Sequence, residues 1–375
     1  MFDGYFEGKR VLVTGVSGVK GTWLALMLLR AGAAVTGLDK RRAPVRSNFS
    51  AAALGSRIRF VQGDVRDLAL VRELIGEADC VFHLAAEAIV GEAMRNPLEA
   101  YSTNTLGTAT VLESLRLAGD AGAAKRVVFI TTDKVYRPKH GELWVETDEL
   151  GANGPYAVSK ACAEWVIRDY LRCYFASGGP LIGVARAGNV VVGGDLHSSS
   201  TTQGSGRIFV DCYEALAEGR SPAIFRPTFT RPYTYGLDIL SGYMTLMSRL
   251  DRDGIAGEPF NFGPYEQLGV SNALLATKIC DLWGGGLLWQ GETPREEPFD
   301  YQSLSTDKSR QRLSWRPAFT LYEALSETTT WYKAWAALGQ NVTEGCLYEL
   351  NCGLIDRHRA AAARLGIEWA GESKG

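Results

Sequence analysis

The chain has 375 residues, of which 46% are hydrophobic and 22% are charged. This composition is typical of a globular protein with material for two to three domains, and it excludes a collagen, a disordered tail and a bundle of membrane helices. Forty Lys and Arg residues against 42 Asp and Glu residues leave a net charge of −2, so charge gives no reason to expect a nucleic acid or a membrane as partner.

The cysteines and the first residues bear on the cellular compartment. Seven cysteines are scattered without a C-x-x-C pair, and residues 1–7 (MFDGYFE) lack the basic and apolar regions of a signal peptide. The sequence contains no run of 18 apolar residues, and its four histidines lack metal-ligand spacing. We therefore expect a cytoplasmic protein with reduced thiols, no membrane span and no metal site.

Short apolar segments alternate with helical patterns through the first half of the chain. Strands are expected at residues 10–14 (RVLVT), 34–39 (AVTGLD), 58–62 (IRFVQ), 80–84 (CVFHL), 126–130 (RVVFI) and 181–185 (LIGVA). Helical spacing of apolar residues follows the first strand and recurs over 97–117 and 156–170. Apolar strands that alternate with helices predict a Rossmann-like α/β fold, a doubly wound parallel sheet covered on both faces.

The pattern changes after about residue 190. Residues 193–206 are rich in Gly, Ser and Thr and predict a long loop, after which helices and short strands mix irregularly. We expect a nucleotide-binding domain over 8–190, to which later segments return, and a smaller mixed α/β substrate lobe over 191–338. A helical tail is expected over 339–375.

A glycine-rich turn joins the first strand to the first helix. Gly15, Gly18 and Gly21 let the backbone turn tightly and let a pyrophosphate approach the amides at the helix start. Asp39 ends the second strand, where an acid hydrogen-bonds the ribose hydroxyls and repels a 2′-phosphate. This favours NAD as the cofactor, although the basic residues 40–42 (KRR) leave NADP as an alternative.

Two further motifs indicate proton transfer. Tyr156 and Lys160 lie one turn apart on a predicted helix, where a lysine ammonium lowers the pKa of a neighbouring phenol so that the phenol takes a hydroxyl proton. Thr132, Asp133 and Lys134 follow the fifth strand, and ligands bind at the carboxyl ends of parallel strands in such folds. From the residue types alone, a solvated turn with a local ion pair is an equal alternative for Asp133 and Lys134.

Together these motifs resemble the extended short-chain dehydrogenase/reductases, the nucleotide-sugar epimerases and dehydratases, and are most similar to the CDP-glucose 4,6-dehydratase family. The resemblance covers about residues 8–335. Besides the glycine turn and the Tyr-Lys pair, it is carried by segments at 19–24 (VKGTWL), 83–86 (HLAA), 103–104 (TN), 132–136 (TDKVY), 159–164 (SKACAE), 186–189 (RAGN), 231–232 (RP) and 240–243 (LSGY).

The resemblance implies a hydro-lyase that uses NAD to convert a nucleotide-linked hexose, CDP-glucose foremost, to its 4-keto-6-deoxy sugar. Tyr156, assisted by Thr132 and Lys160, would take the proton of the sugar 4-hydroxyl as C4 is oxidised. Lys134 would then remove the proton from C5 while Asp133 protonates the departing 6-hydroxyl. Return of hydride to C6 would complete the turnover.

The same resemblance assigns binding residues and partners. Cofactor contacts are expected on the phosphate turn, at the ends of later strands and on the catalytic helix: Gly15, Ser17, Gly18, Val19, Lys20, Gly21, Asp39, Asp64, Val65, Leu84, Ala85, Ala86, Asn104, Tyr156 and Lys160. Substrate contacts are expected at Glu87, Asn189, Arg207 and Arg231. The implied partners are the nucleotide sugar and a second copy of the chain, which would dock as a homodimer through the helices at 97–117 and 156–170.

Two other functions remain open. A 4-epimerase on the same scaffold would need Tyr156 but neither Asp133 nor Lys134. A non-catalytic NAD-binding regulatory protein would have no need of Thr132, Tyr156 and Lys160 together, and the departure of residues 87–93 (EAIVGEA) from the family pattern is its best support. The sequence leaves the nucleotide and the sugar undetermined.

Overall fold

The computed structural model describes residues 1–139, 142–196, 207–224, 226–252, 254–264, 269–285, 288–290 and 303–371. Within these residues the core is a parallel seven-stranded sheet in the order β10-β6-β5-β4-β1-β2-β3. Its strands are β1 (Arg10–Thr14), β2 (Ala34–Asp39), β3 (Arg59–Gln62), β4 (Cys80–His83), β5 (Arg126–Ile130), β6 (Leu181–Ala187) and β10 (Pro259–Phe262). The predicted doubly wound α/β fold is confirmed.

The strand order of the sheet reverses between β1 and β4. β1 pairs in parallel with β2 on one side and with β4 on the other, so that Leu12 lies opposite both Thr36 and Val81. β2 leads outward to β3, whereas β4 leads in the other direction to β5, β6 and β10. In open sheets of this kind ligands bind outside the carboxyl ends of the strands at this switch point. The glycine turn follows β1 directly and therefore lies there.

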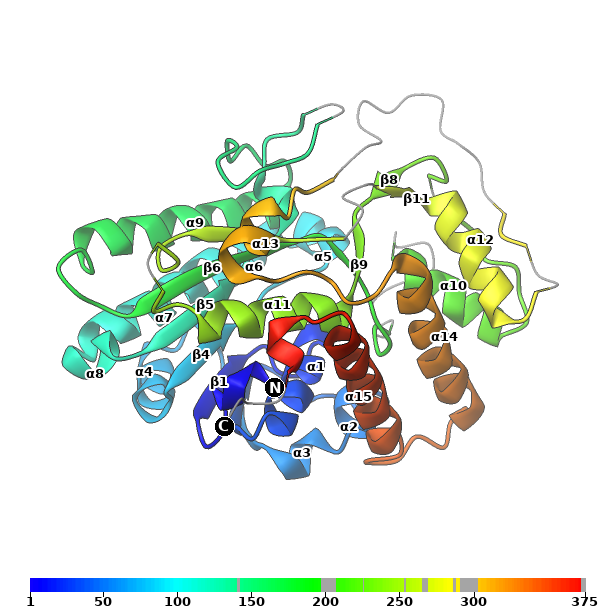
Figure 1. The fold of residues 1–375 in the computed structure, drawn as a ribbon, viewed down its shortest axis with the longest axis horizontal. Helices are drawn as coiled ribbons and strands as arrows, with labels where there is room; N and C mark the ends of the chain where they lie inside the picture. The colour runs from blue at the N-terminus through cyan, green and yellow to red at the C-terminus, as the bar shows by residue number, and fades with distance from the viewer. Residues whose placement is uncertain are drawn as a thin grey trace.

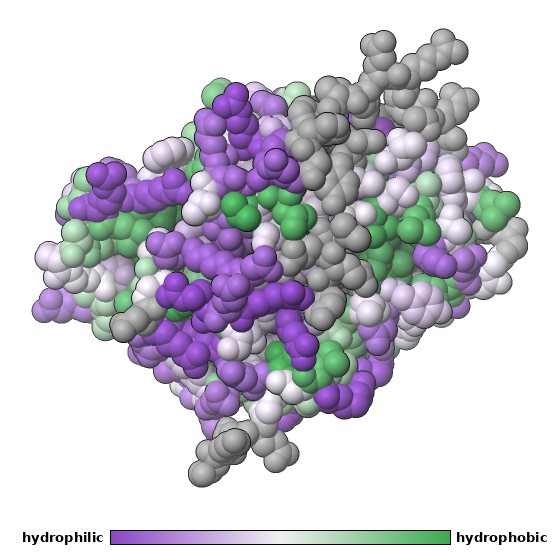
Figure 2. All heavy atoms as spheres, turned by 45° about the horizontal axis from the view of Figure 1, so that its top comes forward, coloured by the Kyte–Doolittle hydropathy of each residue, from purple (hydrophilic) through white to green (hydrophobic). Residues whose placement is uncertain are grey.

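Helices cover both faces of the sheet (Figure 1) because alternate strand residues face opposite cores. Leu12 and Val81 pack into a core with α4, α7 and α9, whereas Val13 and Phe82 pack into a core with α1 and α11. The bounds of these helices are α1 (Val19–Arg30), α4 (Leu68–Glu77), α7 (Gly107–Leu117), α9 (Pro155–Cys173) and α11 (Gly236–Ser248). Figure 2 shows apolar side chains at the end of the molecule where α7, α8 (Asp120–Ala123) and α9 lie, beside a central hydrophilic band.

The strands predicted from the sequence are β1 to β6. Three have the predicted bounds, and the other three differ by one or two residues at one end. The edge strand β10 was not predicted. It comes from the region after residue 190 and pairs with β6, with Phe260 opposite Ala185. The chain thus leaves the sheet and later returns to it.

The helical pattern over 97–117 forms three consecutive segments instead of one regular helix. They are α6 (Pro97–Tyr101), a π-helical turn η2 (Ser102–Leu106) and α7. A π-turn shifts the register of the side chains that follow it and is frequent at functional sites. Here Asn104 lies within the turn and is fully buried.

A smaller lobe lies beside the carboxyl edge of the sheet, on the right of Figure 1. It contains α10 (Ile208–Ala217), β8 (Thr230–Arg231), β11 (Val270–Ser271), α12 (Asn272–Trp283) and α14 (Leu321–Leu338). Tyr213 of α10 stacks on Tyr332 of α14 with ring centroids 4.1 Å apart. A two-stranded pair, β7 (Asn189–Val191) with β9 (Tyr233–Tyr235), leads from the sheet into this lobe. Of the predicted 193–206 loop, residues 197–206 lie outside the described residues.

The C-terminal residues pack against the sheet domain. α15 (Tyr348–Arg364) places His358 2.7 Å from the carboxylate of Asp238 on α11, and this carboxylate also accepts the backbone amide of Ala318. The 3-10 turn η4 (Glu368–Ala370) stacks Trp369 on Phe2 near the N-terminus. The remaining helices are η1 (Phe2–Gly4), α2 (Asn48–Ala51), α3 (Leu54–Arg57), α5 (Val90–Arg95), η3 (Asp133–Val135) and α13 (Asp307–Leu313). Over the described part of the chain, none of the helices has the length and apolar character needed to span a bilayer.

Candidate active site

A cleft of about 1740 Å³ opens at the carboxyl ends of the strands and extends to the smaller lobe. Most residues predicted for the site line it: Gly15, Ser17, Gly18, Val19, Lys20, Gly21, Asp39, Asp64, Val65, Leu84, Ala85, Ala86, Glu87, Thr132, Lys134, Tyr156, Lys160, Asn189, Arg207 and Arg231. The two other predicted residues, Asp133 and Asn104, are fully buried behind this lining.

The phosphate turn has the shape that a pyrophosphate needs. Gly15 has a φ of +71°, and a Cβ there would lie 2.8 Å from the backbone nitrogen of Ala85. A Cβ on Gly21 would lie 2.2 Å from the carbonyl oxygen of Gly15. Gly18 is the N-cap of α1 and carries no capping side chain, so the first amides of α1 are left for a ligand. These residues therefore fit the diphosphate of a dinucleotide.

Asp39 is held at the end of β2 beside this turn. Its carboxylate accepts the backbone amide of Ser17 at 3.0 Å and the Ser17 hydroxyl at 2.6 Å. Asp64, at the end of the next strand, pairs with Arg66, whose guanidinium lowers the pKa of this carboxyl to about 2. Both acids thus line the cleft where the adenosine is expected to bind.

A buried histidine supports the wall of the cleft. His83 Nδ1 lies 2.9 Å from the hydroxyl of Thr14, and its Nε2 lies 3.3 Å from the hydroxyl of Thr108. The Thr14 hydroxyl also accepts the amide of Ala85, which closely approaches Gly15. Burial lowers the pKa of His83 to about 3, so the ring is neutral. His83 was set aside as a metal ligand because the histidines lack metal-ligand spacing in the sequence, but this supporting role was not predicted.

Tyr156 and Lys160 project from α9 toward the end of β5. Burial raises the pKa of Tyr156 to about 12, although a hydrogen bond with the Thr132 side chain acts in the opposite direction. Lys160 donates to the carbonyl of Ile130 at 3.0 Å. Burial, followed by the nearby charge of Lys20, lowers the pKa of Lys160 to about 8. The predicted triad of Thr132, Tyr156 and Lys160 is therefore assembled.

Asp133 lies directly behind this triad. Its Oδ1 accepts the Thr132 hydroxyl at 3.0 Å, whereas its Oδ2 has no hydrogen-bond partner among the described residues. A Cβ on Gly188 would lie only 3.2 Å from that Oδ2, so any residue larger than glycine would crowd the carboxylate. The Nζ of Lys134 is 3.8 Å from Asp133 and donates to the Oδ1 of Asn189 at 3.4 Å. The acid and the amine are thus adjacent to the threonine and the tyrosine.

Lys20 and Tyr243 add a second buried pair near the same point. The Nζ of Lys20 lies 3.5 Å from the hydroxyl of Tyr243, and burial lowers the pKa of Lys20 to about 8. The negative charge of Asp133 opposes this lowering of the Lys20 pKa, so Lys20 and Asp133 interact electrostatically. Lys20 was predicted to contact the cofactor. The role of Tyr243 was not predicted, because Tyr243 lies far along the chain on α11.

Asn104 joins the cleft wall to the catalytic helix. Its side-chain carbonyl accepts the backbone amide of Glu87 at 2.8 Å, and its amide group donates to the hydroxyl of Ser159 at 2.8 Å. The Ser159 hydroxyl in turn donates to the carbonyl of Tyr156. Asn104, predicted to contact the cofactor, is therefore placed where it positions residues that line the cleft. Burial raises the pKa of Glu87, which does line it.

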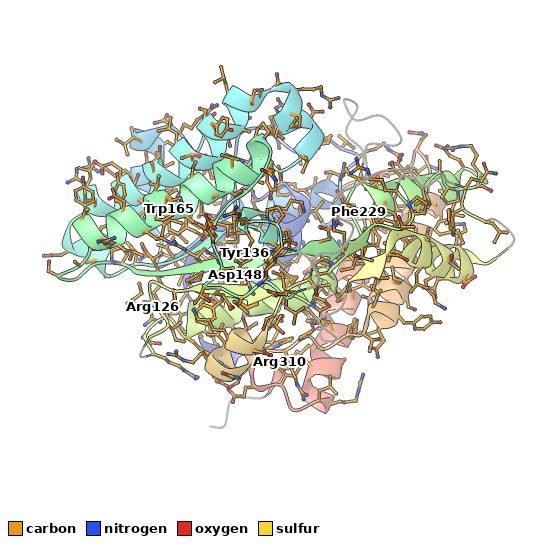
Figure 3. All side chains as sticks on the ribbon, turned by 90° about the horizontal axis from the view of Figure 1, so that it is seen from above. Arg126, Tyr136, Asp148, Trp165, Phe229 and Arg310 are labelled. Carbon is orange, nitrogen blue, oxygen red and sulfur yellow. The ribbon has the colours of Figure 1, made fainter. Side chains whose placement is uncertain are left out.

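A buried ion pair fixes α9 against the sheet. Arg186 of β6 donates to Glu164 of α9 at 2.8 Å and to the hydroxyl of Tyr136 at 2.8 Å. Glu164 also accepts the hydroxyl of Thr131, the residue before Thr132. Tyr136 is labelled near the centre of the molecule in Figure 3. Because Glu164 is one turn beyond Lys160, this network sets the position of the catalytic helix relative to β5.

The substrate side of the cleft carries two predicted arginines. Arg231 of β8 stacks its guanidinium 3.4 Å from the ring centroid of Phe229, which is labelled on the smaller lobe in Figure 3. Arg207 lies at the start of α10 and pairs with Asp195. Burial lowers the pKa of Arg207. Both line the cleft with Asn189.

Comparison with known proteins assigns the chain to a family. Residues 12–177 match the family model described as GDP-mannose 4,6 dehydratase. CDP-glucose 4,6-dehydratase of Salmonella typhimurium is 34% identical over 345 residues, which cover 88% of this chain and 92% of that protein. The chain belongs to the epimerase/dehydratase family of extended short-chain dehydrogenase/reductases. The predicted family is thus confirmed.

Two further members of this family show its breadth. UDP-glucose 4-epimerase 2 of Arabidopsis thaliana is 26% identical over 86% of this chain and 95% of its own. The crystal structure of dTDP-glucose 4,6-dehydratase from Streptomyces venezuelae, which has NAD bound, superposes with a TM-score of 0.73. It is 26% identical and covers 89% of this chain and all of that one. The fold is therefore shared by dehydratases and epimerases, and the site must distinguish them.

Proposed function

We propose that the protein is an NAD-dependent nucleotide-sugar 4,6-dehydratase, a hydro-lyase, and that its substrate is CDP-glucose. The observation that carries this proposal is the adjacent acid and amine, Asp133 and Lys134, beside the Thr132 and Tyr156 pair. An enzyme that only oxidises and reduces C4 has no use for a second acid and base. Elimination of water across C5 and C6 requires both.

The residues of the chain divide the proton transfers between them. Tyr156, with Thr132 hydrogen-bonded to it, takes the proton of the 4-hydroxyl. Lys160, one turn further along α9, provides a positive charge that stabilises the phenolate. The resulting 4-keto group acidifies C5, and Lys134, which faces the cleft, removes that proton. Asp133 protonates the departing 6-hydroxyl. NAD held at the phosphate turn would supply the redox chemistry, taking hydride from C4 and giving it back to C6, and Lys134 then returns its proton to C5.

The choice of CDP-glucose as the substrate rests on the sequence identity to one relative. The Salmonella typhimurium CDP-glucose 4,6-dehydratase matches across nearly its whole length, at 34% identity. The dTDP-glucose 4,6-dehydratase of Xanthomonas campestris pv. campestris covers a similar share of the chain at 27% identity. The nucleotide and the hexose are tested together in the experiment below.

The alternative with specific support is a 4-epimerase. UDP-glucose 4-epimerase 2 of Arabidopsis thaliana matches almost end to end, and epimerases need the same Thr-Tyr-Lys arrangement. In that case Asp133 and Lys134 would be bystanders. The burial of Asp133 and its contact with Lys134 favour the dehydratase, because a carboxyl with an unpartnered oxygen among the described residues is costly to bury without a function.

Substitution of Asp133 by Asn tests the proposed function. The variant keeps the side-chain volume but cannot donate the proton, so turnover to the dehydrated product is expected to fall by about 100-fold or more. C4 oxidation does not need Asp133, so the absorbance of reduced cofactor at 340 nm is expected to build up when CDP-glucose is added. The wild type, which regenerates its cofactor, is the control and shows no lasting build-up.

The outcome that contradicts the dehydratase is a variant that turns over like the wild type. An isobaric product from both proteins would then identify an epimerase. The same incubations with dTDP-, UDP- and GDP-glucose identify the nucleotide. If CDP-glucose is not the preferred substrate but another nucleotide sugar loses water, the reaction stands and the nucleotide assignment is overturned.

A further inference from the structure

Lys40 follows Asp39 directly and faces the part of the cleft where the adenosine ribose is expected. A lysine at that place attracts the 2′-phosphate that distinguishes NADP from NAD. In the structure, however, Lys40 Nζ donates to the carboxylate of Glu99 at 2.6 Å and lies 3.8 Å from Asp64. The Lys40 ammonium that would bind the 2′-phosphate is thus already paired with the carboxylates of Glu99 and Asp64.

A second cation completes this cluster. The guanidinium of Arg66 bonds Asp64 at 2.6 Å, Glu99 at 3.0 Å and the Ser102 hydroxyl at 2.8 Å. Lys40 first and Arg66 second lower the pKa of Glu99, so this carboxyl is ionised at neutral pH. Two cations and two anions leave the cluster with no net charge, and Asp39 beside it adds a negative one.

We infer that Glu99 makes the site selective for NAD over NADP by holding Lys40 away from a 2′-phosphate. Lys40, Asp64 and Glu99 all line the cleft on the same side as Asp39. A 2′-phosphate placed there would meet the carboxylates of Asp39 and Glu99 and would have to break the Lys40–Glu99 bond. The 2′-hydroxyl of NAD needs only an acceptor, which Asp39 provides.

The position of Glu99 in the chain explains why no local motif contains it. Lys40 directly follows β2, whereas Glu99 lies on α6 and its Oε1 also accepts the hydroxyl of Thr103. The basic run at 40–42 alone suggests NADP as an alternative, and the acid that neutralises its first member is 59 residues away. This inference rests on the proposed function, because it concerns the cofactor of that same site.

Direct binding of dinucleotides to the full chain, without sugar substrate, tests the inference. Affinities for NAD and NADP are measured by titration calorimetry for the wild type, Glu99→Gln, and Glu99→Gln combined with Lys40→Met. Glu99→Gln is expected to bind NADP about 10-fold more tightly, with the NAD affinity changed less than about threefold. The added Lys40→Met is expected to remove the gain. The matched control is Glu77→Gln, which breaks an exposed pair with Arg59 away from the cleft.

The possible failures are distinguishable. An unchanged ratio of NADP to NAD affinity in Glu99→Gln would overturn the inference and leave the dehydratase intact. A gain that survives Lys40→Met would also overturn it, and would assign the phosphate to Arg41 or Arg42. A wild type that binds neither dinucleotide would overturn the proposed function together with the inference. Because the Lys40–Glu99 pair is half-exposed, the variants are expected to fold, and thermal unfolding checks this.

Discussion

At the scale of single residues, the site depends on groups that are buried without their usual partners. Asp133 is fully buried with one oxygen lacking a hydrogen-bond partner in the described chain, and Lys20 and Lys160 have a pKa lowered by burial to about 8. Such environments are costly to folding and are found where chemistry requires them. The cleft thus brings two lysines of lowered pKa close to the buried carboxyl of Asp133.

The stability of the protein is expected to fall in mild acid because of His83. The unfolded ring has a pKa near 6.5, and burial lowers the pKa in the folded state to about 3. Between these values the unfolded state binds more protons, so the free energy of unfolding decreases as pH falls. Between pH 7 and pH 5 the decrease from this residue is about 2 kcal/mol.

Urea unfolding of the wild type and of His83→Gln at both pH values measures this contribution. The variant lacks the titrating group, so its stability is expected to depend less on pH in this range, whatever its absolute stability. The two proteins should respond alike between pH 7 and pH 8, where His83 is neutral in both states. Equal losses of stability from pH 7 to pH 5 in both proteins would contradict the neutral, buried ring.

Residue types at strand ends were predictable, whereas partners from distant segments were not. The glycine turn, Asp39, Thr132, Tyr156 and Lys160 follow strands or share a helix face, so spacing alone placed them. Tyr243, Thr108 and Glu99 reach the site from other helices, and no short-range pattern links them to it. Asn104 is buried within a π-turn, and the sequence carries no recognised signal for such a turn.

At the scale of elements, the buried network between β6 and α9 determines where the catalytic side chains lie. Arg186→Met would leave the buried Glu164 carboxylate with only the Thr131 hydroxyl and the partly exposed Arg168, 3.9 Å away, so we expect a loss of about 3 kcal/mol in the free energy of unfolding. Arg59→Met, which breaks an exposed pair with Glu77, is the matched control and is expected to cost less than about 1 kcal/mol.

Denaturant midpoints of the two variants give the comparison. Arg186→Met is also expected to weaken binding of NAD, because α9 carries Tyr156 and Lys160 and is no longer held against β5. Similar midpoints for the two variants would show that the buried pair does not position the helix. The prediction of strands β1 to β6 succeeded because each is apolar and bounded by turns, whereas β10 is a four-residue strand within an irregular region.

At the scale of the whole molecule, exposed apolar side chains on one helical surface support a homodimer. Leu98, Leu106 and Trp165 are 82%, 53% and 58% exposed on α6, the π-turn and α9. Trp165 is labelled on the surface of α9 in Figure 3, and Figure 2 shows apolar side chains at that end. These are the helices predicted from the sequence as the interface, and large exposed apolar surfaces mark association sites.

Leu106→Glu is expected to prevent the predicted homodimer from forming, because a carboxylate would have to be buried in the interface. Light scattering after size-exclusion chromatography gives the mass. The matched control is Tyr322→Glu, since Tyr322 is 59% exposed on α14 in the other lobe and is expected to leave the mass unchanged. A wild type that is monomeric at all concentrations would contradict the proposed homodimer.

In the proposed reaction, oxidation at C4, loss of water and reduction at C6 all occur in one site. The most direct test is incubation with NAD and CDP-glucose that carries deuterium at C4, with the product analysed by mass spectrometry and NMR. We expect a product lighter by one water whose deuterium is found in the C6 methyl group. A product of unchanged mass with the deuterium still at C4 would contradict the dehydratase and indicate an epimerase.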